Sequence, residues 1–241
     1  MPLASRKSSL TVIVPLFQEE DGVAKLAQGL ARFHASERDI RDVDFVLVDD
    51  GSTDRTAELL RTHFADWPAR ILTHERNRGL TAALATGLTA ARGDYVGWLD
   101  SDLTYEPEAL SGLAAQLDAG ADVACTSCYH PQGQVVGVPR WRLHLSQTAS
   151  RLYRRLTRVP LHTFTGMVRV YRHEVLVRCP MARSGFLGVT EVLLKAIRAG
   201  YRVVEAPAVL RVRSAGTSKM RTFRVGKQHL RLMWDWLRDR L

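Results

Sequence analysis

Three short apolar runs, each closed by proline or aspartate, stand out in the first hundred residues. They are Leu10 to Leu16, Asp44 to Val48 and Tyr95 to Leu99. Short apolar runs rich in β-branched residues are typical of parallel strands that are buried on both faces. A weaker run from Arg70 to Thr73 predicts a fourth strand.

Helical patterns separate these predicted strands. They cover Glu19 to Phe33, Thr56 to Phe64 after the cap candidates Ser52 and Asp54, and Leu80 to Ala91. Strictly alternating strands and helices are typical of a doubly wound α/β sheet, which binds its ligands at the carboxyl ends of the strands. The sequence therefore predicts a mixed, mostly parallel, Rossmann-like sheet flanked by helices.

The second half of the chain has a looser pattern, and no low-complexity linker interrupts it. We therefore predict one domain over residues 1–241, with a core from about 10 to 220 and a basic amphipathic helix over 221–241. The further predicted elements are helices at Pro107 to Leu117, Arg140 to Arg158 and Val189 to Ala199, and extended segments at Asp122 to Thr126, Phe164 to Tyr171 and Val203 to Val212.

The segment from Phe223 to Leu241 combines apolar residues at helical spacing with five basic residues, and Arg140 to Arg158 mixes leucines with six arginines. Two interpretations remain open for this pattern. The helices lie in a membrane interface and bind anionic lipid, or their apolar faces pack on the sheet.

Charge and cysteine content narrow the class of protein. A formal net charge of +9 and a pI near 9.9 favour anionic partners. A nucleic-acid-binding module would leave the acidic strand ends described below unexplained, so we expect no nucleic acid partner. Three cysteines are too few for a disulfide framework, and no apolar run is long enough to span a bilayer, so we expect a cytoplasmic protein with at most peripheral membrane contact.

Candidate ligand-binding residues lie at the ends of two of the predicted strands. Pro15 lies near the end of the first strand, with Phe17 and Glu19 after it, and the second ends at Val48 before two aspartates, of which Asp50 is the second. A buried strand that ends in carboxylates carries a desolvation cost unless the carboxylates are used. We therefore expect the two aspartates to hydrogen-bond to a base or a ribose, with Ser52 or Asp54 as a helix cap.

The third strand ends in the triplet Asp100, Ser101 and Asp102. Mg²⁺ and Mn²⁺ prefer oxygen ligands and commonly combine one or two carboxylates with phosphate oxygens. The sequence therefore predicts a site for a metal and a diphosphate at this turn.

As an ordered set, these motifs resemble glycosyltransferase family 2. The set consists of P-x-F-x-E, VDDGSTD and DSDLTYEPE. The downstream segments TGMVRVYR, GYRVVEAP and RVRSAGTSK are similar to the branch that contains dolichol-phosphate mannose synthases. The resemblance spans about residues 10–220 and implies a GT-A fold and a nucleotide-sugar donor.

The resemblance also implies roles for individual residues. Asp102 would ligate Mg²⁺ or Mn²⁺, and Arg213 and Lys219 would clamp the phosphates, which makes these three the expected catalytic residues. Asp100 and Ser101 would line the ribose and diphosphate. The nucleoside would be held by Pro15, Phe17, Glu19, Val48 and Asp50.

Two positions depart from the family pattern. The family usually has a glutamine as second metal ligand where this chain has Thr104, whose hydroxyl is a poorer ligand. It tends to have arginine at Cys128, so one cation on the diphosphate side is missing. A pseudo-enzyme that binds a nucleotide sugar without transfer therefore remains an alternative.

For the reaction, we predict inverting transfer of a sugar to a polyprenyl phosphate, with GDP-mannose as the favoured donor and Arg142 receiving the acceptor phosphate. Such an acceptor is already anionic at neutral pH and needs no protein base. The alternative is transfer to a hydroxyl of a soluble or saccharide acceptor, with Glu191 as the base.

Overall fold

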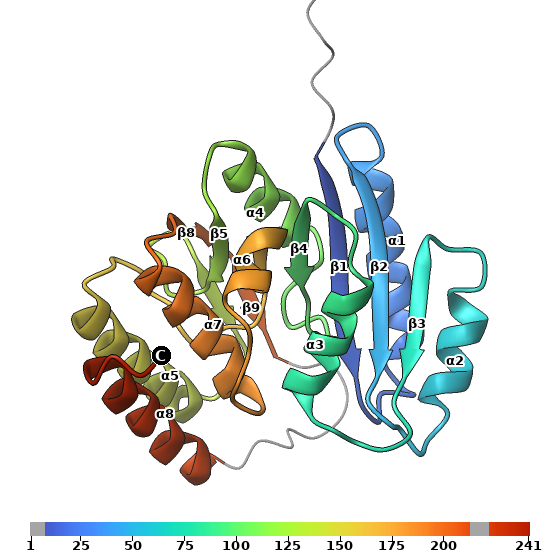
Figure 1. Ribbon diagram of the computed structural model, residues 1–241. Helices are drawn as coiled ribbons and strands as arrows, with labels where there is room; N and C mark the ends of the chain where they lie inside the picture. Colours follow the sequence, from blue (N-terminus) through green and yellow to red (C-terminus); the bar gives the residue numbers. More distant parts are fainter. Residues whose placement is uncertain (1–7, 213–221) are drawn as a thin grey trace, which may run out of the picture.

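The computed structural model describes residues 8–212 and 222–241, and its centre is a seven-stranded sheet with the order β3-β2-β1-β4-β7-β5-β8 (Figure 1). Every strand except β7 runs in the same direction, because β7 pairs antiparallel with both β4 and β5. The predicted mixed, mostly parallel sheet is confirmed. The strands are β1 (Ser9–Leu16), β2 (Asp42–Asp49), β3 (Ala69–Thr73), β4 (Tyr95–Trp98), β5 (Val123–Ser127), β7 (Arg169–Arg172) and β8 (Val203–Pro207).

Helices cover both faces of the sheet because alternate residues of the buried strands point to opposite sides. In β1, Leu10, Val12 and Val14 pack with α1 (Val23–Glu37) and α4 (Ala109–Asp118), whereas Ile13 packs with α3 on the other face. The first face also carries α2 (Thr56–His63). The second carries α3 (Leu80–Ala90), α6 (His173–Arg178) and α7 (Phe186–Arg198), with α5 (Arg140–Thr157) and α8 (Thr222–Leu237) beside them (Figure 1).

Two short elements have no counterpart in the sequence prediction: β6 (Gln134–Val136), and α6, which has only six residues. β6 forms a separate two-stranded parallel sheet with β9 (Val209–Arg211), which lies within the predicted extended segment from Val203 to Val212. The predicted extended segment from Phe164 to Tyr171 contributes a strand only from Arg169 onward. Elements this short depend on distant partners, so local periodicity does not reveal them.

The prediction that Ser52 or Asp54 caps α2 is wrong. The cap position belongs to Arg55, which makes no side-chain cap hydrogen bond. Asp54 instead accepts the backbone N–H of Thr56 at 3.0 Å, and Ser52 Oγ accepts the backbone N–H of Gln18 at 2.9 Å. Both side chains hold the loop between β2 and α2 in place.

Helices α5 and α8 expose much of their apolar surface. On α8, Leu230, Trp234 and Leu237 are 61%, 53% and 66% exposed, while Leu232 is buried. Trp141 and Leu145 of α5 are about half exposed. Among the described residues, no helix is long and apolar enough to cross a bilayer.

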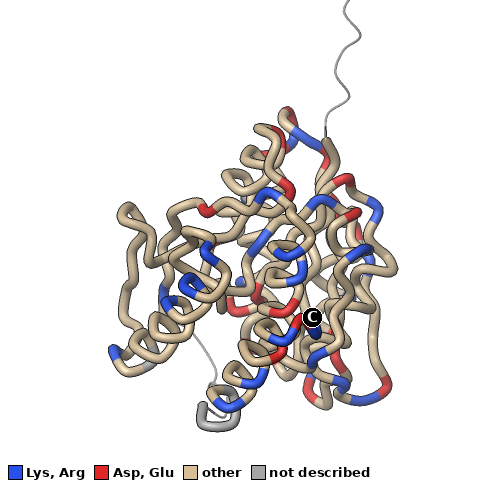
Figure 2. The backbone as a smooth tube through the Cα atoms, turned by 60° about the vertical axis from the view of Figure 1, so that its left-hand side comes forward, with Lys and Arg blue, Asp and Glu red and all other residues tan. Residues whose placement is uncertain are grey.

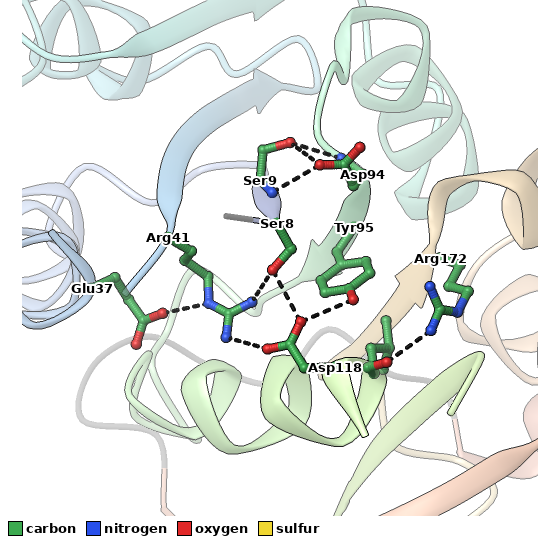
Figure 3. Close-up of polar contacts among 9 residues, drawn as sticks. Ser8, Ser9, Glu37, Arg41, Asp94, Tyr95, Asp118 and Arg172 are labelled. Atoms are coloured by element: carbon green, nitrogen blue, oxygen red, sulfur yellow. Dashed lines mark hydrogen bonds and ion pairs between the residues drawn. The ribbon is translucent and has the colours of Figure 1, made fainter. Parts of the chain in front are cut away.

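A polar network closes the amino-terminal edge of the sheet, away from the acidic strand ends (Figure 3). The buried guanidinium of Arg41 donates to Glu37 at 2.7 Å and to Asp118 at 2.9 Å. Asp118 also accepts hydrogen bonds from Ser8 Oγ and Tyr95 Oη, both at 3.0 Å. The network thereby ties α1, α4, β4 and the start of β1 together.

This network predicts a loss of stability in acid. Partial burial acts to raise the pKa of Asp118, but hydrogen bonds from Arg41, Tyr95 and Ser8 outweigh it, so the pKa lies below its ordinary value of 3.8. A carboxylate with a lowered folded-state pKa stabilises the fold above its unfolded pKa and loses that contribution as the pH falls. We expect the free energy of unfolding to decrease below about pH 4 and to decrease less in Asp118→Asn. Urea titrations from pH 3 to 7 check this, and identical slopes in both proteins would contradict it.

Candidate active site

The carboxyl ends of β1, β2 and β4 lie next to one another because these strands are adjacent and parallel. Leu16 is in register with Asp49, and Ile13 is in register with Trp98. The three polar segments predicted from the sequence therefore meet at one edge of the sheet, where doubly wound folds bind their ligands.

The loops after β1 and β2 interlock through Gln18. Its Oε1 accepts the backbone N–H groups of Thr53 at 3.3 Å and Asp54 at 3.2 Å, and its Nε2 donates to Thr53 Oγ1 at 2.9 Å. Gln18 has a φ of 56°, a conformation that is costly for a residue other than glycine and persists only when its surroundings hold it. Its neighbours Phe17 and Glu19 are thus kept at fixed places on the edge.

The residues predicted to hold the nucleoside lie at this edge with different exposures. Pro15, Phe17 and Glu19 are half-buried, whereas Val48 and Asp50 are buried. The backbone N–H of Glu19 donates to the hydroxyl of α2's first residue at 2.8 Å. The surface that a nucleoside could touch is therefore formed by the loop after β1.

The carboxylate of Asp50 already binds the protein. Oδ1 accepts the backbone N–H of Arg78 at 2.9 Å and contacts His74 Nδ1 at 2.7 Å, and Oδ2 accepts the backbone N–H of Gly79 at 2.7 Å. His74 Nε2 lies 2.9 Å from Thr86 Oγ1 of α3. Asp50 thus fixes the turn that starts α3, and His74 supports it.

Sequence reasoning did not find the role of His74. Its backbone N–H donates to the carbonyl of Asp49 at 2.9 Å, which extends the pairing of β2 and β3 by one residue. The available signal was its place directly after a predicted strand, but a single histidine there does not identify its partner.

The acidic turn after β4 has a strained backbone that a hydrogen bond and close packing hold in place. Asp102 Oδ1 accepts the backbone N–H of Thr104 at 3.1 Å, and Leu103 between them has a φ of 52°. The buried side chain of Leu103 packs on α1, where a Cβ on Gly29 would lie 2.8 Å from its Cδ1. Asp100, Ser101 and Asp102 remain half-buried, so the carboxylates reach the surface on a fixed backbone.

Strand β9 passes beside this turn. The backbone N–H of Arg211 donates to the carbonyl of Thr104 at 2.9 Å. Residues 8–212 and 222–241 hold no group of three or more His, Cys, Asp or Glu side chains arranged to bind a metal. The turn offers the two carboxylates of Asp100 and Asp102, which suits a cation that takes its remaining ligands from phosphate and water.

Three predicted cationic groups cannot be placed. Arg213 and Lys219 lie outside the described residues, in the segment that directly follows β9 and Val212. Arg142 lies in the first turn of α5, but its side chain is outside the described part of the structure.

Cys128, which occupies the position of a family arginine, is buried. Burial raises the pKa of its thiol, although a hydrogen bond with Tyr105 acts in the opposite direction. A neutral, buried thiol cannot supply the positive charge of an arginine. It links the loop after β5 to the acidic turn instead, because Tyr105 is three residues beyond Asp102.

A second polar cluster joins the ends of β5 and β8. The buried carboxylate of Glu205 accepts the backbone N–H groups of His162 at 2.7 Å and Thr163 at 2.6 Å, and contacts His162 Nδ1 at 2.9 Å. Thr163 Oγ1 lies 2.8 Å from Ser127 Oγ at the end of β5. These contacts fix the 162–163 loop to the sheet and were not predicted from the sequence.

Glu191, the base in the alternative reaction, is buried on α7, and both of its carboxylate oxygens contact donor groups of the protein. Oε2 accepts the backbone N–H groups of Ala182 at 2.9 Å and Arg183 at 2.8 Å, and Oε1 lies 3.1 Å from Lys195 Nζ. A base must have an oxygen within reach of the acceptor proton. The observed contacts instead make Glu191 the anchor of the loop before α7.

This geometry predicts the effect of Glu191→Gln. An amide accepts on one arm only, so the variant can keep the two backbone N–H groups but loses the charged contact with Lys195, and the free energy of unfolding should fall by about 1–3 kcal/mol. Turnover should change less than about tenfold, because no proton transfer to this side chain is required. Urea unfolding and steady-state kinetics of the variant measure both effects, with the exposed Glu75→Gln as control. Lost turnover with unchanged stability would favour the base.

Comparison with known proteins gives consistent matches over most of the chain. The glycosyl transferase family 2 model matches residues 11–179. A polyprenol monophosphomannose synthase of Mycolicibacterium smegmatis is 34% identical over 87% of this chain and 80% of its own length. A dolichol-phosphate mannosyltransferase of Pyrococcus furiosus is 28% identical over 96% of this chain and 66% of its own length.

Other relatives and the solved structures add detail. The chain spans about half (48%) of an undecaprenyl-phosphate 4-deoxy-4-formamido-L-arabinose transferase of Pseudomonas fluorescens, at 32% identity over 69% of this chain. A glucosyl-3-phosphoglycerate synthase of Mycobacterium tuberculosis, solved with Mn²⁺, UDP and glucosyl-3-phosphoglycerate, has a TM-score of 0.71 at 19% identity, covering 97% of this chain and 80% of that one. This likeness confirms the GT-A fold. The family model matches more than half of this chain, and the acidic strand ends agree with it. The chain therefore belongs to glycosyl transferase family 2 and is a glycosyltransferase.

Proposed function

We propose that this chain is an inverting glycosyltransferase that moves a sugar, with mannose favoured, from a nucleoside diphosphate to a polyprenyl phosphate. The observation that carries the proposal is the meeting of three acidic strand ends on one sheet edge, in a chain 34% identical to a polyprenol monophosphomannose synthase. The names of two further relatives, a dolichol-phosphate and an undecaprenyl-phosphate transferase, also point to a lipid phosphate acceptor.

The donor would lie along this edge. The nucleoside would contact the half-buried side chains of Pro15, Phe17 and Glu19, with Val48 beneath it. Asp50 would act mainly by holding the turn at Arg78 and Gly79 at the start of α3, since its carboxylate already accepts three hydrogen bonds. The ribose and diphosphate would follow at Asp100 and Ser101.

The acidic turn is suited to a divalent cation, and structural relatives were solved with Mn²⁺ or Mg²⁺ together with UDP. Asp102 would be the protein ligand, with Thr104 as a weaker oxygen donor, directly or through water. When bound, Mg²⁺ or Mn²⁺ supplies positive charge that stabilises the departing diphosphate. The strained Leu103 turn would keep the carboxylate of Asp102 aimed without reorganisation.

Arg213 and Lys219 would complete the charge on the leaving group. Their segment follows β9, whose Arg211 is hydrogen-bonded to Thr104 of the acidic turn. The residues that lead into this segment therefore lie beside the proposed position of the diphosphate. Arg142, at the start of α5, would receive the acceptor phosphate.

The acceptor chemistry needs no protein base. A phosphate monoester has a second pKa of about 6 and is largely dianionic at neutral pH, so its oxygen can attack the anomeric carbon directly. Attack from the face opposite the diphosphate inverts the anomeric configuration. The engaged state of Glu191 is consistent with this route and gives no support to a hydroxyl acceptor.

A lipid acceptor requires contact with a membrane surface, and α5 and α8 have the composition for it. Trp141 of α5 and Leu230, Trp234 and Leu237 of α8 are exposed, and both helices are rich in arginine. Figure 2 shows the Lys and Arg positions along α8, which runs from the grey segment towards the C-terminus. Apolar and basic side chains together are typical of interfacial helices.

The proposal is tested with a matched acceptor panel. Purified protein and Mg²⁺ or Mn²⁺ are incubated with GDP-mannose, UDP-glucose or UDP-N-acetylglucosamine and with either a polyprenyl phosphate or the corresponding polyprenol. We expect nucleoside diphosphate release only with the phosphate, and fastest from GDP-mannose. Equal release with the free alcohol would contradict the phosphate acceptor, and no release with any donor would favour a pseudo-enzyme.

A further inference from the structure

A pocket of about 290 Å³ lies between the loop before α7 and the side of α8, and no step of the proposed reaction uses it. One wall comes from the loop that Glu191 anchors through the backbone of Ala182 and Arg183. The lining residues are Ala182, Arg183, Ser184, Leu187, Gln228 and Arg231.

The two walls are held at a fixed spacing. Arg183 Nη2 donates a hydrogen bond to Asp235 of α8 at 2.6 Å. The carbonyl of Gly185, the residue directly before α7, accepts a hydrogen bond from the hydroxyl of Thr81 in α3. Gln228 and Arg231 are three residues apart on α8, so they share one face of the helix. The pocket is thus built by two packed helices and an anchored loop.

Its lining favours an anion. The lining contains two arginines and no acidic residue. The charge of Arg183 is partly compensated, because Asp235 is bonded to it and Glu191 Oε1 lies 3.9 Å from its Nε. Lys195 Nζ, 3.1 Å from the same oxygen of Glu191, offsets that carboxylate. Arg231 is exposed and makes no ion pair within the described part of the chain, so a net positive charge remains.

Neutral donors accompany this charge. Ser184 contributes a hydroxyl and Gln228 an amide N–H₂. The amino terminus of α7, a helix of 13 residues with no acidic residue in its first turn, adds the positive end of its dipole at Leu187. Arginine and backbone donors in this combination suit the oxygens of a phosphate group.

The size and surroundings of the pocket narrow the ligand class. Pockets for whole small molecules usually have about 300–1,000 Å³, so this one is small for a nucleotide sugar and adequate for a headgroup. Phe186 directly precedes the lining residue Leu187, and Trp234 lies one turn after the lining residue Arg231 on α8; these two side chains are 42% and 53% exposed. A ligand whose phosphate filled the pocket could lay apolar chains along these side chains.

We propose that this pocket binds the phosphate of an anionic phospholipid and so fixes α8 and the loop before α7 on a membrane surface. The site is separate from the acidic turn and goes beyond the transfer reaction. Because the loop also contacts Thr81 near the start of α3, a bound lipid would stabilise the helix that borders the donor edge.

The test compares two charge-matched variants of the whole chain. Arg231→Gln removes a pocket cation, and Arg240→Gln removes an exposed cation near the end of the same helix but outside the pocket. Co-sedimentation is measured with phosphatidylcholine vesicles containing or lacking phosphatidylglycerol. We expect Arg231→Gln to weaken binding to the phosphatidylglycerol vesicles about tenfold and Arg240→Gln at most about threefold, since a site contact exceeds general surface attraction.

A second readout separates lipid headgroup from free phosphate. The side-chain amide resonance of Gln228 is followed while inorganic phosphate or a water-soluble short-chain phosphatidylglycerol is added. We expect the Gln228 resonance to shift and saturate at a lower concentration of the lipid than of inorganic phosphate. These shifts should be lost in the double variant that combines Ser184→Ala and Arg231→Gln. The proposal would be overturned if Arg231→Gln and Arg240→Gln weakened vesicle binding equally. It would also be overturned if the Gln228 resonance shifted with inorganic phosphate but not with the lipid. Nucleoside diphosphate release is assayed separately, so a failed transfer reaction leaves this test intact.

Discussion

Asp102→Asn is expected to lower kcat/KM for nucleoside diphosphate release by about 10²- to 10³-fold, the scale observed when one electrostatic contact to developing charge is removed. The amide oxygen is a weak ligand for a hard cation and carries no charge. It can still accept the backbone N–H of Thr104, so the acidic turn should keep its shape. Steady-state kinetics at saturating Mg²⁺ or Mn²⁺ measure the effect.

The exposed Asp66→Asn serves as control, because it removes the same charge away from the sheet edge. We expect this control to retain activity within about twofold and both variants to unfold at wild-type urea concentrations. Wild-type turnover in Asp102→Asn would remove this carboxylate from the mechanism and leave Asp100 as the alternative.

Gly51→Ala is expected to lower the free energy of unfolding by about 3 kcal/mol or more and to disrupt donor binding. Gly51 has a φ of 71°, and a Cβ there would lie 2.3 Å from the carbonyl carbon of Arg76 and 2.6 Å from the backbone nitrogen of Asn77. Backbone atoms cannot move aside as a flexible side chain can. The loop that carries Arg78 and Gly79 to Asp50 would therefore be displaced.

Two further glycines separate the sources of this loss. Gly79 also has a positive φ, of 89°, with a ψ of 161°, a region that residues other than glycine rarely adopt, but a Cβ there meets nothing within 4 Å. Gly79→Ala should therefore show only the conformational cost of about 1–3 kcal/mol. Gly112 lies in α4 with open space and helical backbone, so Gly112→Ala should be neutral or stabilising. Equal losses at Gly51 and Gly79 in urea unfolding would show that the backbone clash is unimportant.

The central strands could be predicted from sequence because their signal is local. Each of β1, β2 and β4 contains a short apolar run, and its neighbours follow from the alternation of strands and helices. β7 differs, since it begins at the buried Arg169, whose guanidinium donates to the backbone carbonyls of Val189 and Phe164. The predicted extended segment from Phe164 to Tyr171 includes most of β7, but partners that lie 5 and 20 residues from Arg169 do not reveal in the sequence where the strand begins.

Helix α8 shows where periodicity stops being informative. The spacing predicts an amphipathic helix but not which face the protein covers. Leu230 and Trp234 point outward, while Leu232 and His229 are buried against the rest of the fold. The packing of α8 on α5 and α7, which sequence cannot provide, decides the exposed face.

The candidate site was predictable in its location but not in its internal contacts. The acidic strand ends meet as expected, because parallel neighbours bring their carboxyl ends together. The tethering of Asp50 by His74 and of Glu191 by the loop before α7 involves residues from other elements. Carboxylates at strand ends and helix faces therefore identify a site, while their partners decide which of them remain available to a ligand.

The most direct test of lipid-phosphate glycosylation is the mass and anomeric configuration of the lipid extracted after incubating the protein with GDP-mannose, Mg²⁺ or Mn²⁺ and a polyprenyl phosphate. GDP-mannose carries an α-linked mannose, so inversion predicts a β-linked mannosyl phosphate lipid in the organic phase, which Asp102→Asn should produce at a strongly reduced rate. An α-linked lipid product, or release of GDP with no mannosylated lipid in the organic phase, would contradict the account.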